Sequence, residues 1–265
     1  MLRKRGTLLS WLALVVLPVF AQEATPNPSA DDLIAKYLEA IGGRDKLKAV
    51  KTMRMSGKMT MGQGMEAPVT MEMMRPSSMR MEFTFQGMTG IQGFDGSHGW
   101  MVMPFSGKTD PEPIPEDMAK EFKEQADFEG PLVDYKEKGS TVELLGKETV
   151  EGAETYKLKV TKKDGDVQVT YLDAEYFLPI KEASKRKIQG NDVEVETSLG
   201  DYKEVNGLKF AHSIEARAKG APGAQTITVE KIEINPTIDP SRFQMPEKKK
   251  AEEPKAEEKK AGGNP

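Results

Sequence analysis

Histidine and cysteine are scarce in this chain, and its 42 carboxylates are expected mostly on the wet faces of strands. It has no cysteine and two histidines, His98 in the run Asp95-Gly-Ser-His98 and His212 inside a stretch, 208–218, that is expected to be one strand. The two rings would make a metal or catalytic pair only if the fold brought them together, and two unrelated histidines are the simpler interpretation. The sequence also lacks a nucleophile elbow, a phosphate-binding loop and a glycine-rich dinucleotide motif. We therefore predict that the protein is not an enzyme and that it has no cofactor and no metal site.

Methionine is the one abundant side chain with distinctive chemistry. The chain has 16 methionines, most of them in its first half. Thioether sulfur favours Cu(I), and pairs such as Met53/Met55 and Met71/Met73 could supply ligands from adjacent strands. Thioethers are also polarizable and deformable, which suits a surface that receives an apolar ligand of variable shape. Three interpretations stay open: an ordinary core, a lining for acyl chains, and a Cu(I) site.

The spacing of these methionines indicates how they are positioned. From Met53 to Phe85, apolar residues occupy alternate positions in three segments, with polar residues such as Arg54, Lys58 and Glu72 between them. A period of two is typical of strands with one dry and one wet face. The breaks at 62–64 and 75–77 carry Gly or Pro and predict turns between antiparallel neighbours. The dry face, together with one tryptophan from a later strand, gives the predicted nonpolar lining of a ligand site: Met53, Met55, Met59, Met61, Met71, Met73, Met79, Met81, Phe83, Phe85 and Trp100.

The rest of the chain predicts further strands and few helices. Ser29 and Asp32 form a capping-box pattern before a helix that reaches Ile41, and Gly42-Gly43 ends it. A further helical turn is expected over 44–50, a polar loop over 105–113 and a second helix over 114–128. Hairpin signals recur from residue 141 to residue 234. The predicted fold class is mainly β (α+β): a curved antiparallel sheet, or half-open β-barrel, of about 11 strands with helices covering its concave face.

Composition divides the chain into one domain and its appendages. Residues 1–21 carry a basic start, an apolar run and small residues at Val19 and Ala21, which is the pattern of a cleaved secretory signal peptide. We expect a flexible leader at 22–30, a lipid-binding domain at 31–246 and a disordered Lys/Glu/Ala/Pro tail at 247–265. The net charge is −4 and becomes more negative once the basic start is removed, so we predict no affinity for nucleic acid.

Several stretches together resemble one known family. They are Ala35-Lys-Tyr-Leu-Glu-Ala-Ile-Gly-Gly43, Gly93-Phe-Asp-Gly-Ser-His-Gly-Trp100, the run from Val142 to Tyr156, Leu178-Pro-Ile-Lys181 and Phe243-Gln-Met-Pro246. In this order they are similar to the LolA-like outer-membrane lipoprotein-sorting proteins of Gram-negative bacteria, over residues 31–246. The resemblance implies a half-open barrel whose hollow receives the acyl chains of lipoproteins crossing the periplasm. It assigns no individual lipoprotein-handling residue, and the dense methionines and the charged tail depart from the family pattern.

The predicted function is a periplasmic carrier or binding protein for lipoprotein acyl chains or another lipid, acting in transport as a chaperone of its cargo. The amphipathic segments 33–41 and 118–126 are the candidate lids over its hollow. An alternative is a non-catalytic envelope sensor or protein-interaction module on the same fold, and a third is a methionine-rich Cu(I)-binding protein. Expected partners are lipid or lipoprotein acyl chains and envelope proteins of the inner and outer membranes, and the chain is expected to be a monomer.

Overall fold

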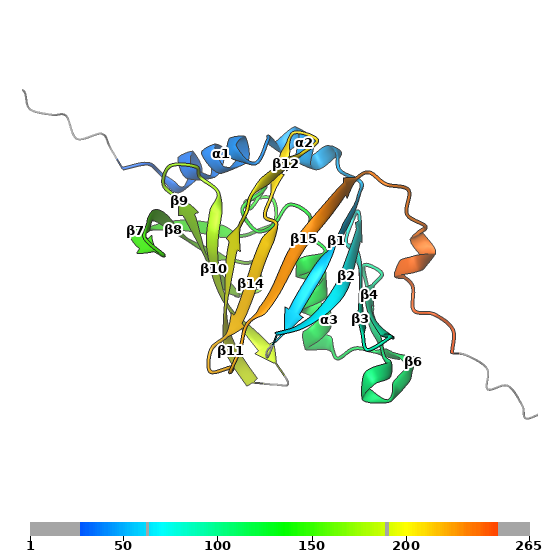
Figure 1. Ribbon diagram of the computed structural model, residues 1–265. Coiled ribbons are helices and arrows are strands. Elements are labelled where there is room, and N and C mark those ends of the chain that lie inside the picture. Colours follow the sequence, from blue (N-terminus) through cyan, green and yellow to red (C-terminus); the bar gives the residue numbers. More distant parts are fainter. Residues whose placement is uncertain (1–26, 62–63, 189–190, 249–265) are drawn as a thin grey trace, which may run out of the picture.

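The chain forms one large antiparallel sheet. This computed structural model describes residues 27–61, 64–188 and 191–248. Thirteen strands form the sheet in the order β6-β5-β4-β3-β2-β1-β15-β14-β11-β10-β9-β8-β7, and β12 and β13 form a separate two-stranded sheet (Figure 1). In chain order the strands are β1 (Thr52–Met61), β2 (Met65–Met74), β3 (Ser78–Phe85), β4 (Met88–Phe94), β5 (Gly99–Met103), β6 (Lys108–Pro113), β7 (Thr141–Val150), β8 (Ala153–Thr161), β9 (Val167–Asp173), β10 (Pro179–Ile188), β11 (Asn191–Gly200), β12 (Lys203–Val205), β13 (Leu208–Phe210), β14 (Ser213–Ala218) and β15 (Gln225–Ile234).

The sheet curves without closing, which confirms the predicted class of an open half-barrel. Its two edge strands, β6 and β7, do not pair with each other, and the strands between them curve round one concave side (Figure 1). Strands that follow one another in the chain pair from β1 to β6 and from β7 to β11, and β15 joins the two halves by pairing with β1 and β14. Because partners in an antiparallel pair point the same way, the registers show which residues share the concave face.

The structure has more strands than the sequence predicted. Residues 105–113, expected to form a polar loop, contain the edge strand β6, which is joined to β5 by pairs such as Trp100 with Pro113. Prolines are tolerated at this place because an edge strand leaves one row of backbone groups unpaired. The single strand expected from Leu208 to Ala218 is divided into β13 and β14, and His212 lies between them instead of inside a strand.

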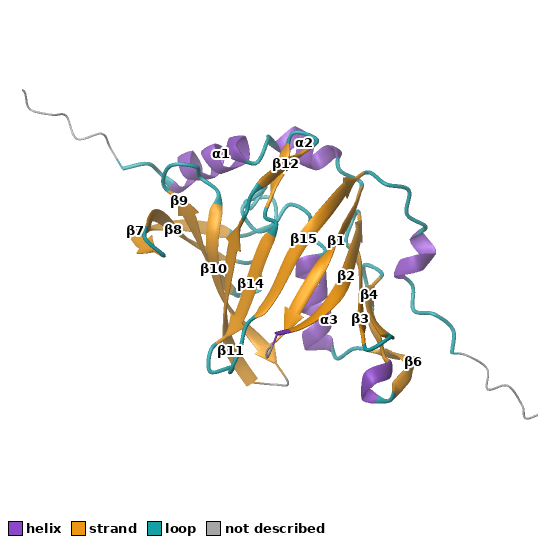
Figure 2. Ribbon diagram, viewed as in Figure 1, coloured by secondary structure: helices purple, strands orange, loops and turns teal. Residues whose placement is uncertain are grey.

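Three α-helices accompany the sheet in the described part of the chain (Figure 2), α1 (Ala30–Ala40), α2 (Arg44–Ala49) and α3 (Glu116–Gln125), together with the short 3-10 helices η2 (Pro104–Ser106) and η3 (Pro240–Phe243). The predicted capping box of α1 is confirmed, because Asp32 N–H donates to Ser29 Oγ at 3.1 Å and Ser29 N–H donates to Asp32 Oδ2 at 2.9 Å. Gly42 ends α1 with a φ of +107°, and a Cβ there would lie 2.0 Å from the carbonyl oxygen of Gly207. The elbow between α1 and α2 therefore requires glycine for its backbone conformation and for its close contact with the β12–β13 turn.

The helices lie at one end of the sheet and inside its curve. α1 and α2 cross one end (Figure 2), and Leu33 of α1 packs in one core with Leu158 and Val160 of β8. α3 confirms the second predicted helix, but it begins after Pro115 and ends at Gln125, so it is shorter than the expected 114–128. It contacts β3, β4 and β5 in one half of the sheet and β10 in the other (Figure 1). α3 thus occupies the hollow and bridges its two walls.

Several predicted segments fall outside the described residues. These are the signal peptide at 1–21, most of the leader at 22–30 and most of the tail at 247–265. Among the helices of the described residues, none combines the length and the apolar character that crossing a bilayer requires.

Candidate functional site

The strand registers bring the predicted methionines onto the concave face. The paired positions form two rows of thioethers across β1, β2 and β3, namely Met53–Met73–Met79 and Met55–Met71–Met81. Both rows continue into β15, where Ile234 pairs with the first and Ile232 with the second. We call these six methionines the methionine face. Its existence follows from the period-two pattern: a register that pairs one methionine with another also pairs the methionines two residues away, and all of them then lie on the same face of the sheet.

α3 covers only part of the methionine face. Met53, Met73 and Met79 are 4%, 5% and 0% exposed, and they share one core with Phe122 of α3 and with Ala126, which follows the last residue of that helix. The three methionines of the second row are only half-buried. The first row is therefore ordinary core in this conformation, whereas the second row forms an incompletely covered apolar surface beside it.

The remaining predicted residues continue the concave face toward the β1–β2 turn. Met59 is buried, and Gln225 Nε2 donates to its sulfur. Phe83 and Phe85 are half-buried, and the ring centroid of Phe83 lies 5.6 Å from that of Phe105. The backbone of Met61 belongs to β1, but its side chain is outside the described part of the molecule.

Trp100 does not join this face, contrary to the prediction. It pairs with Gly93, which pairs with Arg80, so its ring lies on the convex side with the polar residues of β3. The indole is 1% exposed, and its Nε1–H donates to the carbonyl oxygen of Phe243 at 2.7 Å. A Cβ on Gly93 would lie 2.3 Å from the indole, so the glycine makes room for it. Alternation could not assign the side, because β5 carries apolar residues on both of its faces.

A buried carboxylate fastens the C-terminal turn, the short helix η3 (Pro240–Phe243), to the convex face near Trp100. Glu72 is almost fully buried and accepts hydrogen bonds from Arg54 Nε at 2.9 Å and from Arg242 Nε at 2.7 Å. Burial opposes ionisation of Glu72, but the hydrogen bonds from Arg242 and Arg54 outweigh it and hold the pKa of this carboxyl below its usual range. The cluster is structural in character, since each buried charge has a partner.

An ionic latch fastens α3 to the turn between β8 and β9. Lys120 Nζ lies 2.7 Å from Asp164 Oδ2 and 2.6 Å from Asp166 Oδ2, and Lys162 Nζ lies 2.8 Å from Glu124 Oε2. Hydrogen bonds to Asp164 and Asp166 raise the pKa of Lys120, and Lys120 in turn lowers the pKa of Asp164. Sequence reasoning missed this latch, because Lys120 and Asp166 are 46 residues apart and no local pattern connects them.

Two cavities adjoin α3. The first has a volume of about 790 Å³ and lies between α3 and strands β9, β10 and β11, and most of its lining residues are charged, among them Lys185, Glu194 and Glu196. The second has a volume of about 1320 Å³ and extends along α3 from Phe94 to Gln168, with lysines and carboxylates in near-equal number around it. We call them the smaller cavity and the larger cavity. No methionine lines either of these two cavities.

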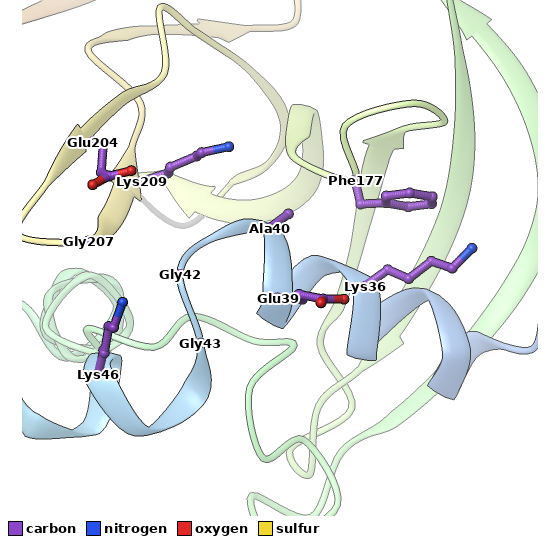
Figure 3. Close-up of a pocket in the computed structure, with 10 residues that line it drawn as sticks. All are labelled: Lys36, Glu39, Ala40, Gly42, Gly43, Lys46, Phe177, Glu204, Gly207 and Lys209. Atoms are coloured by element: carbon purple, nitrogen blue, oxygen red, sulfur yellow. The ribbon is translucent and has the colours of Figure 1, made fainter.

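A further, shallower cavity of about 690 Å³ lies where the α1–α2 elbow meets the β12–β13 hairpin (Figure 3). Lys36, Lys46 and Lys209 line it together with Glu39 and Glu204, so positive and negative side chains nearly balance. Figure 3 shows Lys36 extended toward the ring of Phe177, and the ammonium lies 4.6 Å from the ring centroid. The lysines are exposed, and nothing about the cavity selects a ligand.

The histidines and carboxylates do not assemble into a catalytic arrangement within the described residues. His98 is exposed in the β4–β5 turn, whereas His212 is buried with its Nδ1 3.0 Å from the carbonyl oxygen of Phe210. Oxygens of Glu124, Asp164 and Asp166 lie within 4.8 Å of one another. These carboxylates belong to the latch, where Lys120 pairs with the two aspartates and Lys162 pairs with Glu124.

Comparison with known proteins supports the fold. No protein-family model matches the sequence, and no curated protein matches it. Among solved structures, a DUF1329 family protein from Desulfovibrio piger is 12% identical, with a TM-score of 0.58, over 81% of this chain and 96% of that one. A LolA superfamily protein from Nitrosomonas europaea is 12% identical, with a TM-score of 0.54, over 82% and 98%. A structure described as an outer membrane lipoprotein-sorting protein domain, from Vibrio parahaemolyticus, is 14% identical, with a TM-score of 0.52, over 79% and 97%. The chain thus has a LolA-like fold.

Proposed function

We propose that this protein binds the acyl chain of a lipid or lipoprotein in the hollow of its sheet, with α3 as a movable lid. The observation that carries the proposal is the methionine face, in which one row of thioethers is closed over by α3 and the next is left half-buried. Flexible thioether side chains can follow the shape of different apolar ligands. The proposed activity is binding and release, and it includes no chemical reaction.

α3 suits the role of a lid better than α1, the other helix expected to serve. Leu33 of α1 is fully buried, and the Gly42 elbow holds the end of that helix against the β12–β13 turn. α3 and its C-cap residue Ala126 reach the core of the methionine face through a few apolar residues, chiefly Phe122 and Ala126, and ion pairs of Lys120 and Glu124 join the helix to the β8–β9 turn. Such pairs contribute about 0–1 kcal/mol each. An acyl chain that replaced α3 would exchange similar apolar contacts, so loading and release would not require ATP.

The setting we propose for this activity is the periplasm. The basic, apolar and small-residue pattern of residues 1–21 supports export. A carrier of this kind would shield acyl chains from water between the membranes of the envelope, where each exposed methylene group costs about 0.8 kcal/mol. The LolA-like fold is consistent with such a role.

Native mass spectrometry of the exported protein, purified without detergent, tests the proposal. We expect a bound mass in the lipid range that is released by denaturing extraction. Met71→Asp should abolish it, because a carboxylate on the methionine face makes burial of an acyl chain costly. Thr70→Asp is the matched control, since Thr70 is the adjacent residue on the convex face and its change should leave binding intact. Circular dichroism would establish that both variants fold.

Two other results would redirect the interpretation. A protein that is free of lipid and takes up none, but that retains a stoichiometric protein partner, would replace the carrier by an envelope sensor or interaction module. Tight binding of Cu(I), lost when Met71 and Met73 are changed to Leu, would favour the copper-binding alternative.

A further inference from the structure

Three turns in the N-terminal half of the sheet form an uncharged end. They join β1 to β2, β3 to β4 and β5 to β6, and because successive antiparallel strands alternate in direction, all three lie at the end away from α2 (Figure 1). In a chain with 30% charged residues, the runs 61–65, 85–88 and 104–107 contain no charged side chain. The turns at the opposite end of the same strands carry Arg75 and Asp95. We call the three uncharged runs the rim.

Large apolar side chains are exposed at the rim, on the concave side of the sheet. Met65, Met88 and Phe105 are 43%, 37% and 40% exposed. Met65 continues the alternation of the β2 methionines, and Met88 pairs with Phe85 of β3. The ring of Phe105 joins them over Gly90, where an added Cβ would lie 2.8 Å from it. Single exposed apolar residues are common on protein surfaces, whereas a group of them at one end of one face indicates an interaction site.

A continuous apolar track joins the rim to the methionine face. On the concave side of β1, β2 and β3, every position from the first row of thioethers to the rim is apolar or glycine. From Met53 to Met61 the track is about 26 Å long, at about 3.3 Å per residue. Burial decreases along it, from 0% exposure at Met79 to 43% at Met65. The rim end is therefore exposed to solvent while α3 still covers the buried end.

We propose that the rim is the entrance of the hollow: an acyl chain enters there tail first, follows the track to the methionine face and leaves its head group outside, in water. A polar head that entered first would lose its hydration and find no partner along the track. Because the head stays outside, its size is not limited, and the ligands range from a free fatty acid to an acylated polypeptide. This inference rests on the proposed function, and it deepens it by assigning the entrance, the orientation of the chain and the range of head groups. α3 moves when the tail reaches the first row of thioethers.

The entrance is tested by the rate of palmitate uptake, followed with a fluorescent palmitate analogue. The double variant Met65→Asp/Met88→Asp should slow uptake at least about tenfold, because it places two carboxylates where the chain leaves water. Both side chains are exposed, so the variant should fold, which circular dichroism would establish. Met65→Leu/Met88→Leu should keep the wild-type rate, since the rim stays apolar. Leu145→Asp is the matched control, because Leu145 is 46% exposed but lies in β7, at the opposite edge of the sheet, and its change should leave uptake unaltered.

The orientation is tested with two palmitate derivatives that carry a photoactivatable group at the tail or at the head. The tail group should label α3 and the first row of thioethers, and the head group should label the rim. A palmitoylated peptide should compete with palmitate for the same site. The reverse labelling pattern, a peptide that does not compete, or equal uptake rates in the wild type and the Asp variant of the rim would overturn the inference and leave the proposed lipid-binding function standing. Absence of any palmitate binding, in the wild type and in every variant, would instead overturn the proposed function and the entrance together.

Discussion

A disulfide that ties α3 to the sheet should prevent lipid uptake. A Cβ on Gly99 of β5 would lie 3.7 Å from the Cβ of Ala119 of α3, which is within the separation of about 3.5–4.5 Å that a disulfide needs. The same Cβ would lie 2.2 Å from Cδ1 of Ile114, so the design is Gly99→Cys and Ala119→Cys in an Ile114→Ala background. The chain has no other cysteine, and the reduced protein is therefore its own control.

The size of the effect follows from what holds α3 in place. Ile114 and Phe122 are 8% and 5% exposed, and burial of each stabilises the closed state by roughly 1.5–3 kcal/mol. Adding the latch at about 0–1 kcal/mol per ion pair gives an opening cost of roughly 5 kcal/mol in the wild type. Burial of about six methylene groups, at about 0.8 kcal/mol each, would offset that cost. A long acyl chain can thus open the reduced protein but has no means of opening the oxidised one.

The assay compares palmitate uptake by the oxidised and reduced forms of the same preparation, with thiol titration to measure how much disulfide has formed. We expect uptake by the oxidised form to fall at least about a hundredfold, since an opening cost of a few kcal/mol is replaced by a covalent block. The wild type should respond to neither oxidant nor reductant. Equal uptake by the two forms would refute the reasoning, because it would mean that lipid enters without displacement of α3.

Two further changes test the frame that supports the hollow. Arg242→Met leaves the buried Glu72 with one partner and should lower the free energy of unfolding by about 1–3 kcal/mol at neutral pH. Because the pKa of Glu72 is lowered in the folded state, the stability that its ionised form contributes should disappear as the pH falls through that pKa. An equal loss in urea titrations at neutral and acid pH would contradict the assignment. Gly42→Ala should lower the melting temperature far more than Gly43→Ala. Both residues have positive φ, but only at Gly42 would the added Cβ meet the Gly207 carbonyl oxygen. Similar melting temperatures of the two variants would show that the elbow is not tightly packed.

The sequence predicts most where one local pattern is decisive. Alternation from Met53 to Phe85 placed the methionines on one face because a strand has a fixed period of two, and the Ser29–Asp32 cap was recognisable because its partners are three residues apart. β6 was missed because an edge strand needs no apolar alternation, and its prolines are more typical of a loop.

Features built from distant segments were beyond this reasoning. The side on which Trp100 lies depends on cover from Phe243, 143 residues later in the chain. The latch and the two cavities depend on where α3 comes to rest against the β8–β9 turn, which no local spacing of residues fixes. The sequence therefore predicted the surface that α3 covers, but not the spaces that remain around that helix.

The burial of Trp100 also makes its intrinsic fluorescence a probe of the folded sheet. The chain has two tryptophans, and the other one, Trp11, lies in the predicted signal peptide, so a chain cleaved after Ala21 contains Trp100 alone. Its emission reports on the convex face, where the C-terminal turn covers it, and α3 lies across the sheet from that face. Fluorescence should therefore remain constant while α3 opens and change when the sheet unfolds, so that gating and denaturation can be followed separately in one unlabelled sample.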